Sequence, residues 1–118
     1  MFLTAAVVLS MTAAMAESKN ADAKYAGYSN VYNFNVNTYS LSKALHANQM
    51  QYEKINDIYD MFSYEMRRAG YARKAKRQER VDEAISRNLR AMKSILDDQQ
   101  FKTYRMLLNA TLVNRGLK

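Results

Sequence analysis

Apolar side chains recur at helical spacing over most of this chain, and this periodicity constrains the fold more than any other feature. From Leu41 onward they return every three to four positions, as on the buried face of an amphipathic helix. The sequence contains no Pro and only three Gly, so few residues interrupt these runs. No such helix buries its apolar face alone, so the helices must pack on one another or on a second chain. The chain is therefore predicted to be all-α.

Four helices account for the pattern. The first is short and is capped by Asn37, Thr38 or Ser40. The second ends near Gly70, which suits the left-handed position after a helix, and the fourth ends at Gly116. The apolar faces of the second, third and fourth helices are formed by Tyr52, Ile55, Ile58, Tyr59, Phe62 and Met66; by Val81, Ile85, Leu89, Met92 and Leu96; and by Phe101, Tyr104, Leu108 and Leu112.

The N-terminal third of the chain has a different character. Residues 1–16 combine an apolar stretch with Ala14-Met15-Ala16, the pattern of a secretory signal peptide, although no Lys or Arg precedes Phe2. The alternative for this segment is a short buried helix. Residues 17–37 form a polar arm, flexible or extended, in which 33–37 alternates like a short strand. This strand would pair with its copy in a second chain or lie extended across the helices. We expect an exported, periplasmic chain with one helical domain over residues 38–118.

Two short segments with the same spacing open the second and fourth predicted helices. Each has a Leu followed four positions later by a Gln, and the two Leu residues are 51 positions apart. This spacing predicts a capping box, in which the residue after Leu caps the helix and the Gln side chain reaches back to the cap's N–H. The predicted boxes consist of Leu45, His46 and Gln49, and of Leu96, Asp97 and Gln100.

These motifs resemble the Leu-Thr-x-x-Gln motifs of the Spy/CpxP family of small periplasmic helical proteins. The resemblance covers residues 41–112, and both Thr positions depart from the family pattern, being His46 and Asp97. It implies helical hairpins in an elongated antiparallel homodimer with an extended N-terminal arm. It also implies ATP-independent binding of partly unfolded proteins, and for CpxP-like members the damping of a membrane sensor kinase.

The charge of the chain is concentrated in one window. Between Arg67 and Arg80 there are seven basic residues and one acid, Glu79, so this window holds +6 of the net charge of +7. It is either a solvated helix connection or a surface that attracts an anionic partner. Candidate partners are acidic unfolded proteins, anionic lipid at a membrane surface, cell-envelope polymers and nucleic acid. Off the apolar stripes, Met50, Met61 and Tyr64 are candidates for an exposed apolar patch beside the basic residues. The basic candidates are Arg67, Arg68, Arg73, Lys74, Lys76, Arg77 and Arg80.

Enzyme chemistry has little support in this sequence. There is no Cys and a single His, His46, so neither a dedicated transition-metal site nor a positioned nucleophile and base is expected. No phosphate-cradling loop occurs, and no cofactor is predicted. The basic window lacks helix-turn-helix and RNA-binding motifs, and we expect no nucleic-acid partner.

Two hypotheses from different classes therefore remain. The first is a periplasmic holdase-like chaperone that binds partly unfolded envelope proteins through the basic window and its Met and Tyr neighbours. The second is an envelope stress regulator, adaptor or structural protein with one fixed protein partner.

Overall fold

The described part of the chain, residues 30–118 of a computed structural model, is helical and confirms the all-α prediction. A 3₁₀ turn, η3 (Asn30–Tyr32), and a short helix, α2 (Thr38–Ala44), precede three longer helices. These are α3 (Gln49–Tyr71), α4 (Lys74–Ile95) and α5 (Asp98–Asn114). The predicted signal peptide and residues 17–29 of the predicted arm lie outside the described residues. No helix within residues 30–118 has the length and apolar character needed to cross a membrane.

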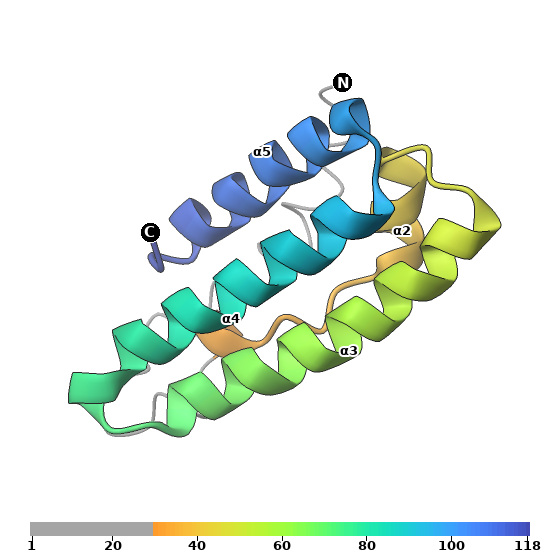
Figure 1. The fold of residues 1–118 in the computed structure, drawn as a ribbon. Helices are drawn as coiled ribbons and strands as arrows, with labels where there is room; N and C mark the ends of the chain where they lie inside the picture. The colour runs from red at the N-terminus through yellow and green to blue at the C-terminus, as the bar shows by residue number, and fades with distance from the viewer. Residues whose placement is uncertain (1–29) are drawn as a thin grey trace.

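The α3–α4 hairpin forms the frame of the domain. The two helices run antiparallel and side by side along their lengths, joined only by Ala72 and Arg73 (Figure 1). Their facing sides carry the apolar residues that the sequence pattern assigns to the core, and Ile55, Met66 and Met92 are completely buried. At about 1.5 Å per residue the 23-residue α3 is about 35 Å long, so the hairpin has two well-separated ends.

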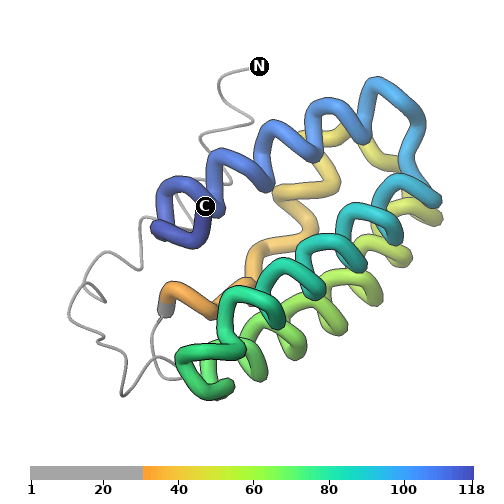
Figure 2. The backbone as a smooth tube through the Cα atoms, turned by 60° about the vertical axis from the view of Figure 1, so that its left-hand side comes forward, coloured from red at the N-terminus to blue at the C-terminus, as the bar shows by residue number. Residues whose placement is uncertain are grey.

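The other elements cover one side of this hairpin. The chain from η3 to α2 passes between the hairpin and α5, as Figure 2 shows. Residues 33–37 have no regular secondary structure and run across the helices with Phe34 buried and Asn33, Asn35 and Asn37 exposed. The alternation therefore reflects a segment with one buried side, and no strand forms among residues 30–118. Asn37 then caps α2 by accepting a hydrogen bond from the Ser40 N–H at 3.0 Å.

A clasp between Phe34 and Arg115 joins the arm to the end of α5. The Arg115 guanidinium lies 4.2 Å from the centre of the Phe34 ring, a cation–π contact worth about 2 kcal/mol when desolvated. The same guanidinium donates hydrogen bonds to the carbonyls of Val31, at 3.2 Å, and Asn33. Burial lowers the pKa of Arg115 to about 10, which leaves the side chain charged at neutral pH. The first and last segments of the domain are therefore held together directly.

Two glycines serve different purposes. The prediction of a left-handed Gly70 at the end of the second helix is wrong, because Gly70 lies inside α3 and its backbone is helical. Its lack of a side chain is required by packing instead: a Cβ here would lie 2.9 Å from the Tyr32 ring. Gly116 does have the predicted left-handed backbone, with φ 75°. It ends α5 in a Schellman motif, in which the Leu117 N–H bonds to the Leu112 carbonyl at 2.9 Å.

Candidate functional site

The predicted basic residues gather at one end of the α3–α4 hairpin. This basic tip consists of Arg67, Arg68, Arg73, Lys74, Lys76, Arg77 and Arg80, which come from the last turns of α3, the link and the first two turns of α4. All except the half-buried Arg77 are exposed. The tip lies at the end of the hairpin remote from the α2–α3 and α4–α5 links (Figure 1).

The start of α4 is electrostatically unfavourable. Arg73 occupies the N-cap without a side-chain hydrogen bond to the helix, and the first turn contains no acidic residue. Lys74 and Lys76 instead place positive charges at the end of the helix where the macrodipole is already positive. Arg77 donates a hydrogen bond to the Ala72 carbonyl at the end of α3, at 3.1 Å. The ion pair between Lys76 and Glu79, at 3.9 Å, joins two largely exposed side chains and contributes little. The tip therefore gathers seven cations around a single acidic residue of the window, Glu79.

An open groove runs between the middle of α3 and the second half of α4. Ile58, Met61 and Ala91 give it apolar walls, and the Met61 side chain is 58% exposed. Across the groove Arg87 of α4 donates a hydrogen bond to a carboxylate oxygen of Glu65 on α3 at 2.9 Å. A second hollow begins on the other side of this ion pair and is lined by Tyr64, Arg68, Ala69, Arg80 and Glu83. We call these two hollows together the hairpin groove.

The structure divides the predicted binding residues into separate places. Met61 and Tyr64 line the hairpin groove together with Arg68 and Arg80 of the basic tip. Met50 does not join them, because it is the second residue of α3 and lies about 25 Å from Arg67 along the helix. Met50, Met61 and Tyr64 are all exposed, as the sequence predicts, but only Met61 and Tyr64 lie in the hairpin groove.

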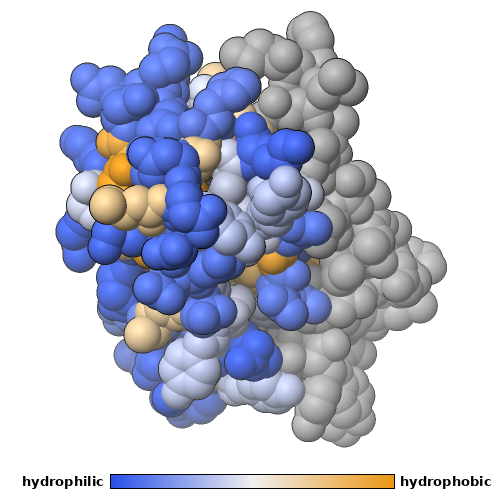
Figure 3. Space-filling model, turned by 90° about the vertical axis from the view of Figure 1, so that its right-hand side faces the viewer, coloured by the Kyte–Doolittle hydropathy of each residue, from blue (hydrophilic) through white to orange (hydrophobic). Residues whose placement is uncertain are grey.

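Met50 instead belongs to the opposite end of the molecule, where the α2–α3 and α4–α5 links lie. Figure 3 views the molecule from this side, and only small apolar areas interrupt its hydrophilic surface. Sequence reasoning also missed two residues of the groove, Arg87 and Arg90. They could have been found from the sequence, because Arg87 and Arg90 follow Arg80 at helical spacing on the exposed side of α4.

Both capping boxes are present, but the first lies two residues later in the sequence than the motif predicts. The second is confirmed: Asp97 caps α5 by accepting from the Gln100 N–H at 2.7 Å, and the Gln100 side chain accepts from the Asp97 N–H at 3.0 Å. The first box is formed by Asn48 and Gln51 rather than by the predicted His46 and Gln49.

His46 and Gln49 have other surroundings. His46 is an exposed residue with φ 57° in the link after α2, a backbone conformation outside the range of a helix cap. Gln49 is exposed as well and donates a hydrogen bond to Glu53 at 3.2 Å. Leu45, the first residue of the predicted motif, is buried in the core, as is Leu96 in the second motif. An Asn is a better cap than a His, so Asn48 was the local signal for the correct box.

The two box glutamines also bond to each other. The Gln51 amide donates to Gln100 Oε1 at 2.9 Å, and the Gln100 amide lies 3.2 Å from Gln51 Oε1. Each glutamine then reaches the link before the other helix: Gln51 donates to the Ile95 carbonyl at 3.0 Å, and Gln100 to the Leu45 carbonyl at 3.2 Å. The capping residues of α3 and α5 thereby fix the two links against each other and hold this end of the hairpin rigid.

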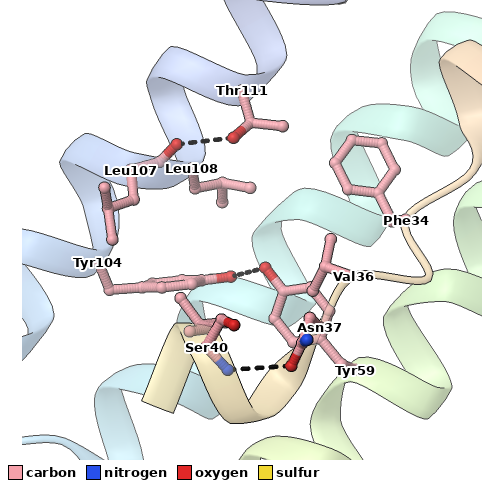
Figure 4. Close-up of a pocket in the computed structure, with 10 residues that line it drawn as sticks. Phe34, Val36, Asn37, Ser40, Tyr59, Tyr104, Leu107, Leu108 and Thr111 are labelled. Carbon is pink, nitrogen blue, oxygen red and sulfur yellow. Dashed lines mark hydrogen bonds between the residues drawn. The ribbon is translucent and has the colours of Figure 1, made fainter. Parts of the chain in front are cut away.

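A small polar network is buried inside the domain (Figure 4). The hydroxyls of Tyr59 on α3 and Tyr104 on α5 lie 2.8 Å apart, and Tyr104 donates to Asn88 Oδ1 on α4. Burial raises the pKa of Tyr59 to about 12 and the pKa of Tyr104 well above its ordinary value. Both hydroxyls therefore stay neutral near pH 7 and link three helices. The adjoining cavity, about 20 Å³, has room for one water molecule.

Within residues 30–118 no three His, Asp or Glu side chains come together in a way that would hold a metal ion. No protein-family model matches the chain, and no curated protein or solved structure matches it either. The resemblance to the Spy/CpxP family therefore stays a prediction from the two motifs.

Proposed function

We propose that the protein is a periplasmic, ATP-independent, holdase-like chaperone, and that it binds partly unfolded proteins in the hairpin groove. The observation that carries this proposal is two adjoining hollows along the hairpin, one lined by the exposed Met61 and the other by Tyr64, Arg68 and Arg80. The motif resemblance supports the periplasmic location and a homodimer as the working form.

The chemistry of the groove suits clients of varied sequence. A methionine side chain is flexible and polarizable, so Met61 can adapt to different apolar client residues. Tyr64 adds an aromatic ring, and Arg68 stacks on it with the guanidinium 5.8 Å from the ring centre. The nearby basic tip attracts acidic segments at long range, and this attraction weakens as salt is added.

The test is suppression of light scattering by two unrelated aggregating proteins, without ATP, at low and high salt. We expect suppression of both clients and a smaller effect at high salt. Met61→Glu places a charge in the apolar part of the groove and should weaken suppression by about tenfold. Met50→Glu is the matched control, because Met50 is as exposed but lies at the other end of α3.

Three outcomes would contradict the proposal: no suppression of either client, suppression of one client only, or equal losses from the two variants. Capture of one dominant partner by the wild-type protein, together with no suppression, would favour the regulator or adaptor with a fixed partner.

A further inference from the structure

The basic tip distributes its charges around the end of the hairpin rather than along one side of it. Successive residues of a helix point about 100° apart, so Arg67 and Arg68 leave α3 in clearly different directions. By the same spacing Lys74 and Lys76 lie about 160° apart around α4. A peptide bound in a groove contacts only the cations that line the groove. Cations arranged around a protruding end can all contact a partner only if that partner is a broad surface.

The tip also carries an exposed tyrosine, a residue type that is enriched where proteins contact the lipid–water boundary. Tyr71, the last residue of α3, is 55% exposed beside the cations. Tyrosine combines an apolar ring with a polar hydroxyl and favours the boundary between lipid and water. Lys and Arg side chains near such a surface each add to binding when the lipid headgroups are anionic.

The start of α4 lacks the features that stabilise a helix N-terminus. Lys74 and Lys76 oppose the macrodipole of α4 in its first turn, which has no acidic residue and no side-chain cap at Arg73. An anionic surface facing the tip removes this repulsion. The same charges would therefore be unfavourable in solution and favourable at the surface.

We propose that the basic tip docks end-on at an anionic lipid surface, with the hairpin standing away from it. The hairpin groove lies along the side of α3 and α4, so most of it stays accessible in this orientation. This inference does not depend on the proposed chaperone function, because it concerns the end of the hairpin and not the contents of the groove.

The test is sedimentation of the full chain with vesicles of phosphatidylglycerol and phosphatidylcholine in equal parts, and with vesicles of phosphatidylcholine alone. We expect binding to the anionic vesicles only, and a decrease as salt is added. The triple variant Arg73→Gln, Lys74→Gln, Lys76→Gln should bind about 100-fold more weakly, since each neutralised cation costs about fivefold. The control is Lys93→Gln, Lys102→Gln, Arg105→Gln, which removes the same charge from exposed positions outside the tip.

A second readout separates a binding role from a structural one. The tip variant should be as stable as the wild type or more stable to urea, because it removes repulsion at the start of α4. The proposal is overturned if the wild type does not bind anionic vesicles, or if the tip and control variants lose equal affinity. It is also overturned if double-stranded DNA competes fully at matched phosphate concentration, since the tip would then be a general polyanion site.

Discussion

Replacing Gln100 by alanine tests how the two capping boxes hold the end of the domain. The change removes the acceptor for the Asp97 N–H, both bonds to Gln51, and the donor for the Leu45 and His46 carbonyls. Gln51 keeps its bonds to the Asn48 N–H and the Ile95 carbonyl, so the partner is not left unsatisfied. Half a capping box and these four weak or shared bonds, of which two share the Gln51 side chain, correspond to about 2 to 3 kcal/mol of stability. We therefore expect the melting temperature to fall by about 10 to 20 °C.

The matched control is Gln49→Ala, because Gln49 has the same side chain and occupies the position that the sequence motif assigns to the box. Its exposed bond to Glu53 predicts a change within about 0.5 kcal/mol. Both variants are compared with the wild type by urea denaturation. A double-mutant cycle of Gln51→Ala and Gln100→Ala should give a coupling of about 1 to 2 kcal/mol. Equal losses from Gln49→Ala and Gln100→Ala, or a coupling near zero, would refute the joined-box explanation.

Three further predictions concern the core. Gly70→Ala should cost more stability than Gly116→Ala, because its Cβ would press on the Tyr32 ring at 2.9 Å. The Gly116 change costs only about 1 kcal/mol for the left-handed backbone, and the reverse order in urea denaturation would contradict this. Phe34→Ala should cost about 3 to 5 kcal/mol by leaving a cavity under the clasp, and a thermal melt unchanged from wild type would show that the arm is not part of the core. The raised pKa of Tyr59 means that the folded state keeps a proton which the unfolded state loses from about pH 10. The wild type should therefore lose stability relative to Tyr59→Phe as the pH rises from about 10 toward 12, by about 1.4 kcal/mol per pH unit. The measurement is the urea midpoint of both proteins across this pH range. A difference between the midpoints that stays constant with pH would contradict the buried network.

The helices could be predicted because each is specified by local, repeated signals. Apolar spacing placed Ile55, Phe62 and Met66 on the buried side of α3, and they are buried. Asn37 and Asp97 are strong caps and do cap their helices. The first capping box was misplaced because two glutamines, Gln49 and Gln51, both follow Leu45 closely enough to suggest a box.

What the sequence could not supply is contact between distant positions. The bond between Gln51 and Gln100 joins residues 49 positions apart, and nothing in either local motif indicates it. The same holds for Gly70, which must lack a side chain because the Tyr32 ring packs against it.

For the candidate site, the sequence located the basic tip as one window. The separation of Met50 from Met61 depends on how far apart a single long helix places them.

The clasp between Phe34 and Arg115 has a mechanical consequence. It ties residues 82 positions apart, Asn33 and Arg115, and closes almost the whole described domain into a loop. A force applied between residues 30 and 118 would load the contacts of Arg115 with Val31, Asn33 and Phe34 before the contacts between α3 and α4. Pulled from its ends, the domain should therefore rupture in two steps, the first releasing the arm and the end of α5 together while the hairpin stays folded.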